Sequence, residues 1–184
     1  MGMPLPVPTF TTDDVRAFPE DGQRYELLEG MLLVTPMPGS AHQVVLSRLL
    51  VELGRFLARA ERAFVVGPGE IEIAPRTLLE PDLLVFPATF APGTPWREMR
   101  GWWLAAEVFS PSSRVYDRDF KRDAYLALGV EEVWLVDPDE RAVFVSRRGG
   151  ERDVRREERV VWRPAGMTGE GVEIEVGGVF RGIP

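Results

Sequence analysis

The chain has 184 residues, of which 45% are hydrophobic and 28% are charged, and its formal net charge is −7. This length and composition suit one globular domain over residues 1–184 with a buried core. The negative charge counts against a broad, non-specific nucleic-acid coat but does not exclude a local basic groove. Because the chain has no cysteine, disulfides and cysteine-ligated zinc are excluded, and we expect a cytoplasmic protein without a membrane span.

The first elements precede a long helix. Residues 1–20 predict an extended, proline-rich arm and a short helix capped by Thr11 or Thr12. Residues 24–36, "RYELLEGMLLVTP", predict two strands that are joined by a turn at Gly30. The domain is therefore expected to begin with a β-hairpin.

A long amphipathic helix is predicted over residues 38–63. Ser40 and Gln43 have the spacing of a capping box. His42, the only histidine of the chain, lies in the first turn on the apolar side, and a single histidine excludes a zinc site built from two or three histidines. The apolar stripe consists of Leu46, Leu49, Leu50, Leu53, Phe56 and Leu57.

Short apolar runs bounded by glycine or proline follow this helix and predict strands. A second helix ends at Gly129, a residue type that favours helix ends, and a hairpin comes after it. The order of elements predicts an α/β or α+β fold in which a mixed β-sheet is flanked by helices. The strand runs are residues 63–67, 70–75, 81–87 and 101–110; the helix is 112–129, the hairpin 131–148, and further strands fall within 150–184.

Two carboxylates belong to apolar strand segments. Asp82 opens the strand "DLLVF", and Glu107 lies near the end of "LAAEVF". A buried carboxylate is costly unless a partner or a cation compensates it. If the two strands are neighbours, both carboxylates reach one sheet edge and suit Mg²⁺, which prefers oxygen ligands and retains water. The alternatives are that Asp82 caps a turn after Pro81 and that Glu107 pairs with an arginine.

The second helix adds three polar residues on one face. Asp117, Lys121 and Tyr125 are spaced four residues apart, and Lys121 is the only lysine of the chain. The helix starts shortly after the Glu107 strand, so Lys121 is able to reach back to the carboxylate pair. The alternative is that Asp117 and Lys121 form an ordinary surface ion pair worth a few tenths of a kcal/mol.

Several separated blocks resemble one protein family. The blocks are "RYELLEGMLLVTPMPGSAHQVVLSRLL", "EPDLLVF" and "AEVFSPSSRVYDRDFKRDAYLALGVEEVWLVDP", and the resemblance extends over roughly Arg24 to Arg148. In this order they resemble the Uma-two family of restriction-endonuclease-like proteins, a group of the PD-(D/E)XK nuclease superfamily. The resemblance implies a restriction-endonuclease-like fold and an endonuclease.

The superfamily pattern implies roles for individual residues. Asp82 matches the aspartate of the Pro-Asp element, and Glu107 matches the first acidic residue of the (D/E)XK element. Where that element has its lysine, this chain has Phe109. The family is similar in carrying its lysine on the following helix, which here is Lys121. Lys121 and Tyr125 also resemble the helical Gln-x-x-x-Tyr element of some superfamily nucleases, with lysine in place of glutamine.

The implied chemistry is hydrolysis of a nucleic-acid phosphodiester with Mg²⁺ or Mn²⁺ as cofactor. Asp82, Glu107 and the backbone carbonyl of Val108 are expected to bind the metal, which activates water and polarises the phosphoryl oxygen. Lys121 is expected to orient the attacking water or to stabilise the developing charge. Three arginines near the site are predicted to contact flanking phosphates: Arg114, Arg118 and Arg122.

Other residues are predicted to support this site. Asp117 and Tyr125 accompany Lys121, and His42 and Glu26 match the family's opening block. His42 either contacts a phosphate or water at the site or is satisfied by a neighbouring carboxylate or by the helix end. Glu26 either serves as a further metal ligand or general base or pairs with Arg24.

Two functional alternatives stay open. The absence of lysine at Phe109 and the acidic net charge also fit an inactive interaction module that keeps the nuclease fold. A hydrolase of small phosphodiesters is the other alternative. The expected partner is nucleic acid, DNA in the first instance, but the sequence does not distinguish DNA from RNA. The resemblance also implies a homo-oligomer, because one subunit of this size rarely cuts two strands unaided.

Overall fold

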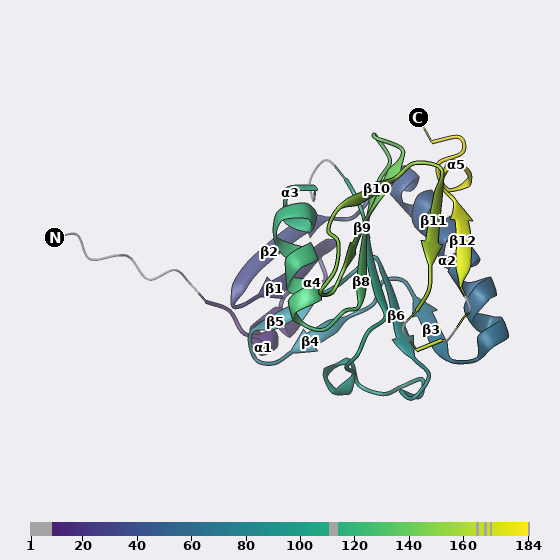
Figure 1. Cartoon of the computed structure of the whole chain (residues 1–184). Coiled ribbons are helices and arrows are strands. Elements are labelled where there is room, and N and C mark those ends of the chain that lie inside the picture. Colours follow the sequence, from purple (N-terminus) through teal and green to yellow (C-terminus); the bar gives the residue numbers. More distant parts are fainter. Residues whose placement is uncertain (1–8, 111–113, 165, 168, 170, 184) are drawn as a thin grey trace.

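The computed structural model describes residues 9–110, 114–164, 166, 167, 169 and 171–183. The predicted arm falls mostly within residues 1–8, outside the described residues. The described part contains a central sheet, a second sheet that includes the N-terminal hairpin, and a two-stranded C-terminal sheet (Figure 1). The predicted α/β class is confirmed, but the strands form three sheets rather than one.

The central sheet has six strands in the order β10-β9-β8-β7-β6-β3. Its only parallel pair among the described residues is β7 with β8, and all its other neighbours are antiparallel. The strands β6, β7 and β8 lie in the middle of the sheet and are buried on both faces. The bounds are β3 Ala63–Val66, β6 Leu83–Pro87, β7 Leu104–Val108, β8 Glu132–Asp137, β9 Ala142–Arg147 and β10 Val154–Arg156.

The second sheet has the order β2-β1-β5-β4 and begins with the predicted hairpin. The strand β5 was not predicted, because its three residues are too few to show an alternating pattern. The short helix α1 (Thr12–Arg16) packs against this sheet, and its capping box, formed by Thr11 and Asp14, confirms the predicted N-cap. The bounds are β1 Gln23–Leu28, β2 Met31–Pro36, β4 Ile71–Ile73 and β5 Thr77–Leu79.

Helix α2 (Ser40–Ala60) covers one face of the central sheet. The predicted Ser40–Gln43 capping box is wrong: Gly39 is the N-cap, Ser40 is already helical, and no side chain caps the first turn. The C-terminal elements complete this side of the core and include Trp162, which packs against Trp134. They are β11 (Arg159–Trp162), β12 (Val172–Glu175) and α5 (Val176–Val179).

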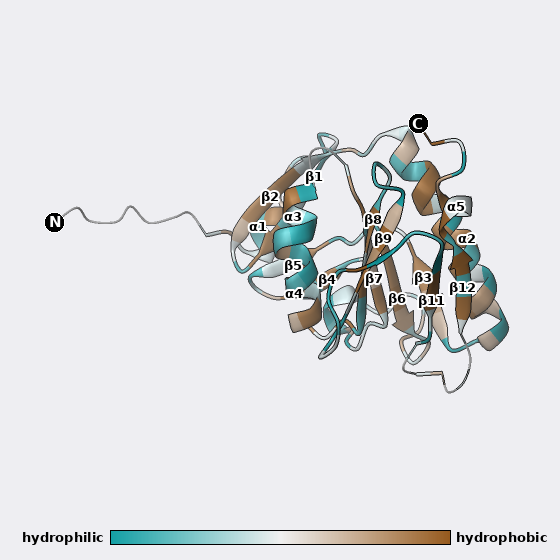
Figure 2. Ribbon diagram, turned by 45° about the horizontal axis from the view of Figure 1, so that its top comes forward, coloured by the Kyte–Doolittle hydropathy of each residue, from teal (hydrophilic) through white to brown (hydrophobic). Residues whose placement is uncertain are grey.

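The other face of the central sheet is covered by the second predicted helix, by the second sheet and by the η1 turn (Trp96–Glu98). This helix has three parts: α3 (Arg114–Tyr116), a π-helical segment η2 (Asp117–Lys121) and α4 (Arg122–Ala127). Figure 2 shows the strands of the central sheet as hydrophobic and the outer surface of this helix as hydrophilic. The chain leaves the helix at Gly129, as predicted, with a φ of 100°.

A close backbone approach beside β6 requires glycine at position 69. The Gly69 amide donates a hydrogen bond of 3.0 Å to the Pro81 carbonyl, and a Cβ on Gly69 would lie 2.4 Å from Cβ of Leu84. Replacing Gly69 by alanine is expected to lower the free energy of unfolding by about 1–3 kcal/mol, because the loop must move away from β6. Urea unfolding checks this. Gly177→Ala is the control, because nothing lies within 4 Å of its added Cβ; equal losses in both variants would contradict the steric explanation.

Candidate active site

The two predicted strand carboxylates lie at one end of the central sheet. Asp82 directly precedes β6, and Glu107 is the penultimate residue of β7. The antiparallel register pairs Leu83 with Ala106, so its continuation by one residue sets Asp82 opposite Glu107. Both side chains are buried, with exposed fractions of 2% and 1%. The pairing of neighbouring strands therefore brings the two carboxylates to one place, as the sequence predicted.

Asp82 is held by three donors. Its Oδ1 accepts a hydrogen bond of 2.9 Å from Nη1 of Arg24. Its Oδ2 accepts one of 2.9 Å from the Val108 amide and lies 2.9 Å from Nε2 of His42. Burial opposes ionisation, but His42, Arg24 and the Val108 amide outweigh it and lower the pKa of Asp82 to about 2. The alternative in which Asp82 only caps a turn is wrong, because its carboxylate contacts Arg24, His42 and the Val108 amide. His42 lies at the site, and its Nε2 is paired with the Asp82 carboxylate.

Asp82→Asn is expected to change the pH dependence of stability. Because the folded pKa of about 2 lies below the ordinary value of 3.8, ionised Asp82 stabilises the fold above about pH 4. This contribution, about 2 kcal/mol from the pKa difference, is lost as the pH falls from 4 towards 2. Urea unfolding of both proteins across this range checks it. A free-energy difference between wild type and variant that stays constant from pH 7 to pH 2.5 would refute it.

Glu107 belongs to a buried cluster around the only lysine. The Lys121 Nζ lies 2.6 Å from Oε2 of Glu26, 3.2 Å from Oε1 of Glu107 and 3.3 Å from Oδ1 of Asp117. Glu107 Oε1 also accepts a hydrogen bond of 2.6 Å from the Tyr125 hydroxyl. None of these five side chains is more than 2% exposed. The surface ion pair considered for Asp117 and Lys121 is therefore wrong, and so is the pairing of Glu107 with an arginine.

The π-helical segment positions this cluster. Asp117 and Lys121 are its first and last residues and its only buried ones. A π turn is wider than an α turn and is frequently found at functional sites. Tyr125 follows four residues later on α4 and is fully buried. One helical face therefore presents all three predicted side chains to Glu107.

Burial raises the pKa of Glu107 well above its ordinary value; Lys121 opposes this, whereas the neighbouring carboxylates of Asp117, Asp82 and Glu26 add to it. Burial also lowers the pKa of Lys121, but Glu107, Glu26 and Asp117 outweigh it, and the net pKa of the ammonium is raised. The site thus contains an ammonium beside a carboxylate whose ionised form is disfavoured by burial and by the neighbouring carboxylates. A buried group of this kind is typical of functional sites.

Phe109 occupies the place of the superfamily lysine and packs into the core. It is 4% exposed and belongs to the same hydrophobic cluster as Tyr125 and Trp102. Alternate strand residues share a face, so Phe109 points to the side that carries Glu107. Here the helix supplies Lys121 to Glu107 instead. Trp102 and Trp134 are buried in the core and are not available for stacking on bases.

The side chains surround a small recess of about 20 Å³, room for one water or ion. No group of three or more His, Cys, Asp or Glu side chains with metal-site geometry occurs within the described ranges. The donor set still fits Mg²⁺, which takes few protein ligands and keeps water. Val108 donates its amide to Asp82, and N–H and C=O of one strand residue face the same edge, so the Val108 carbonyl lies on the Asp82 side. The recess is lined by Arg24, Thr35, Pro36, Pro38, His42, Asp82, Glu107, Ser110, Asp117 and Lys121.

The buried charges of the site also favour a cation. Four carboxylates are buried at the site together with two basic side chains, Arg24 and Lys121. With all four carboxylates counted as ionised and histidine counted as neutral, the excess is two negative charges, which burial makes costly. One divalent cation neutralises this excess. The carboxylates are Glu26, Asp82, Glu107 and Asp117.

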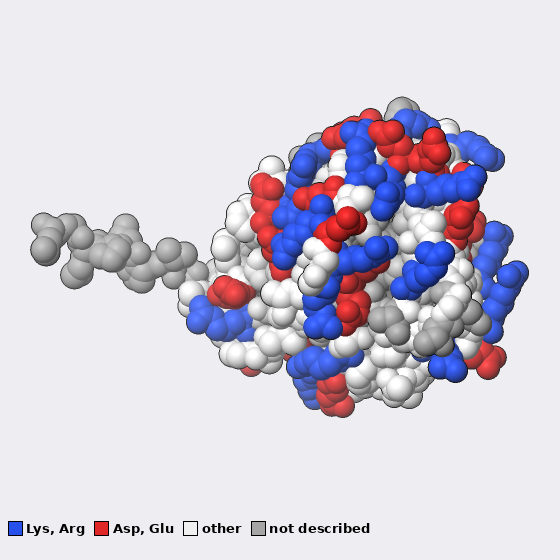
Figure 3. All heavy atoms as spheres, in the orientation of Figure 1, with Lys and Arg blue, Asp and Glu red and all other residues white. Residues whose placement is uncertain are grey.

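The three arginines that were predicted to bind phosphate contact other side chains of the protein. Arg114 pairs with Asp137 and Asp139 at 2.6 Å each, and Arg122 pairs with Asp123 at 3.0 Å and with Asp153. The Arg118 guanidinium lies 5.8 Å from the centre of the Phe144 ring. Basic and acidic side chains are interspersed on the face that Figure 3 shows. Phosphate binding by these arginines stays a prediction.

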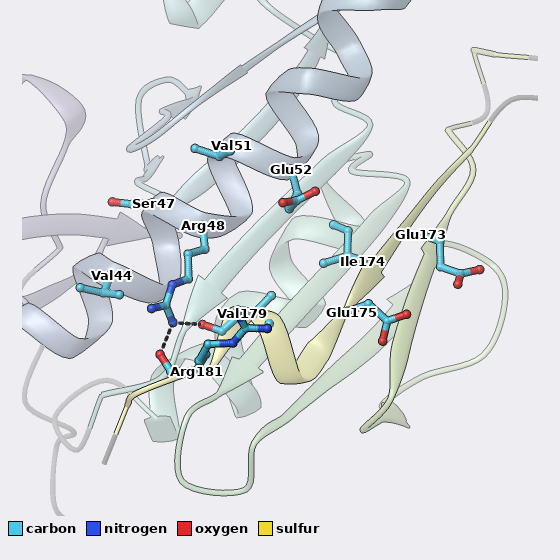
Figure 4. A pocket seen from close by; sticks show the side chains of 11 residues that line it. Val44, Ser47, Arg48, Val51, Glu52, Glu173, Ile174, Glu175, Val179 and Arg181 are labelled. Carbon is cyan, nitrogen blue, oxygen red and sulfur yellow. Dashed lines mark hydrogen bonds between the residues drawn. The ribbon is translucent and has the colours of Figure 1, made fainter.

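A larger groove of about 610 Å³ lies elsewhere, between α2 and the β12–α5 segment (Figure 4). Arg48 crosses it and donates to the carbonyls of Val179 at 2.8 Å and Arg181 at 2.6 Å. None of the candidate catalytic residues lines this groove. The small carboxylate recess, rather than the larger groove, is therefore the candidate active site.

Comparison with known proteins fits this geometry. The model of the Uma-two (Uma2) family, described as "putative restriction endonuclease", matches residues 12–176. The chain belongs to the Uma2 family. A crystal structure from Anabaena variabilis, of "a putative nuclease belonging to DUF820", has a TM-score of 0.75 and 21% identity to this Uma2 chain. The match covers 93% of this chain and 97% of that one, and it shows a shared fold.

No curated protein matches this Uma2 chain. Among the helices of the described part, none has the length and apolar character needed to cross a bilayer. The family and the shared fold thus agree with the restriction-endonuclease-like architecture that the sequence predicted.

Arg24 enters the sequence prediction only as an alternative partner of Glu26. In the structure Arg24 contacts Asp82 and Glu80, whereas Glu26 contacts Lys121 and accepts the Glu80 amide at 2.8 Å. Alternation in "RYELL" puts positions 24 and 26 on one strand face and was the available signal. It could not assign their partners, because these lie more than 50 residues away in the chain.

Proposed function

We propose that this Uma2 chain is a metal-dependent endonuclease that hydrolyses nucleic-acid phosphodiester bonds. The observation that carries the proposal is the buried excess of carboxylate over basic charge at the end of β6 and β7, with an ammonium fixed beside it. A purely structural site has no reason to bury uncompensated charge, because apolar residues are cheaper there. The family description supports the nuclease class.

Asp82 and Glu107 are the residues proposed to bind Mg²⁺ or Mn²⁺, together with the Val108 carbonyl. When bound, the cation supplies a more acidic water and polarises the phosphoryl oxygen. Arg24 and His42 keep Asp82 ionised and in place. Lys121, next to Glu107, stabilises the negative charge that develops on the phosphoryl oxygens, and it needs no reorganisation because three carboxylates fix it.

The substrate class is proposed to be DNA in the first instance, in keeping with the family description, and a homo-oligomer is the proposed assembly. The test incubates the full chain with supercoiled plasmid, linear duplex, single-stranded DNA and RNA, in Mg²⁺ or Mn²⁺ and in EDTA. We expect cleavage of a polymer that EDTA abolishes. If no polymer is cleaved and neither cation raises the melting temperature, the nuclease proposal is wrong and the chain is an inactive interaction module. Hydrolysis of a chromogenic phosphodiester alone would favour the small-substrate hydrolase.

A further inference from the structure

The point at which three buried carboxylates converge is already occupied by a side chain. Nζ of Lys121 lies within 3.3 Å of Glu26, Glu107 and Asp117. These carboxylates come from three separate elements, β1, β7 and η2. Carboxylate oxygens from three elements thus surround one cation, and this cation is an ammonium. We infer that Lys121 occupies a second cation position, so that the site binds one divalent ion and not two.

Geometry supports a single ion. In two-metal sites the ions lie about 3.5–4 Å apart and share carboxylate ligands. Glu107 is the shared residue here: it belongs both to the proposed Asp82–Glu107 metal site and to the Lys121 cluster, with Oε1 3.2 Å from Nζ. A second ion bound to Glu107, Glu26 and Asp117 would need the volume that Nζ fills. The recess of about 20 Å³ has room for one ion or water.

Charge leads to the same count. The buried excess of two negative charges, with Lys121 included as a cation, is neutralised by one divalent ion. A second divalent ion would leave an excess of two positive charges in a buried site, which is as costly as the initial negative excess. Removal of the Lys121 charge changes the balance to three negative charges and opens the position that the ammonium filled.

Glu26 and Asp117 hold the ammonium of Lys121 in place. Glu26 and Asp117 contact the ammonium from two separate elements, β1 of the second sheet and the π-helical segment η2. The Glu26 carboxylate is itself fixed by the Glu80 amide at 2.8 Å. Both acids are therefore proposed as positioning residues for Lys121 and not as metal ligands of the wild-type protein.

The test counts Mn²⁺ ions on the full chain, by calorimetric titration and by electron paramagnetic resonance. The inference rests on the proposed metal site, but neither readout needs nuclease activity. Wild type is expected to bind one ion per chain and to show no spin coupling between two Mn²⁺ at saturation. Lys121→Met is expected to bind two ions that are spin-coupled. The control Arg147→Met removes a cation paired with Glu132, outside the site, and is expected to bind one.

Two coupled ions in wild type would overturn the inference, as would a folded Lys121→Met protein that binds only one. If Lys121→Met does not fold, the wild-type resonance spectrum alone decides between one ion and a coupled pair. Absence of any bound Mn²⁺ in wild type would overturn the metal site together with this inference. One bound ion without cleavage of any substrate would sink the proposed nuclease function and leave the ion count standing.

Discussion

Glu107→Gln is expected to abolish metal-dependent cleavage while leaving the protein as stable as wild type or more stable. Gln keeps the size of the side chain and an oxygen that accepts from Tyr125 and Lys121. It removes a buried negative charge whose pKa burial raises, so folding no longer pays for desolvating it. Cleavage is expected to fall by about 10²-fold or more, because the variant loses a proposed ligand of the cation that stabilises the transition state electrostatically. Initial rates, Mn²⁺ titration and urea unfolding measure the three effects.

Glu132→Gln is the matched control for this prediction. Glu132 is also a buried strand carboxylate, 5% exposed, on the strand that neighbours β7, and it pairs with Arg147 outside the site. Its replacement is expected to leave Mn²⁺ binding and the cleavage rate within about twofold of wild type, since distant sites act independently. If Glu107→Gln binds Mn²⁺ as tightly as Glu132→Gln does, Glu107 is not a metal ligand.

Lys121→Met is expected to have the largest effect on stability. The change leaves Glu26, Glu107 and Asp117 without their shared cation inside the protein. Breaking a buried ion pair on one side costs about 3–5 kcal/mol, a large part of the total stability of a small domain. The loss is expected to be greatest at neutral pH and smaller near pH 5, because the unpaired carboxylates, whose pKa then rises, take up protons in the folded state. Urea unfolding at both pH values measures it.

Added Mn²⁺ provides a further check on the same variant. Ligand that binds only the folded state stabilises it, and the opened position gives Lys121→Met more sites than wild type. Mn²⁺ is therefore expected to raise the melting temperature of the variant more than that of wild type. Arg147→Met, whose ion pair is half-exposed, is expected to lose less than about 1 kcal/mol. A loss in Lys121→Met no larger than in this control would show that the cluster does not need its ammonium.

The fold was predictable where its signals are local. Most strands and both helices follow from apolar periodicity, and the capping of α1 follows from Thr11. The strand β5 and the division into three sheets were not predictable, because three-residue strands carry no periodic pattern and the choice of strand neighbours depends on contacts distant in sequence. The predicted capping box of α2 is wrong because the helix already includes Ser40, which leaves Gly39, a residue without a side chain, at the N-cap position.

Sequence alone determined the candidate chemistry. Asp82 and Glu107 are costly in apolar strands, and Lys121 is the only lysine, so all three were recognisable without a structure. Tertiary structure decided what each of them contacts. The pairing of β6 with β7 brings Asp82 and Glu107 together. The hairpin then places Arg24 against Asp82, and the π turn buries Lys121 where its ammonium contacts Glu26, Glu107 and Asp117. Local patterns identify a side chain that needs a partner, whereas the partner comes from long-range packing, which no local pattern encodes.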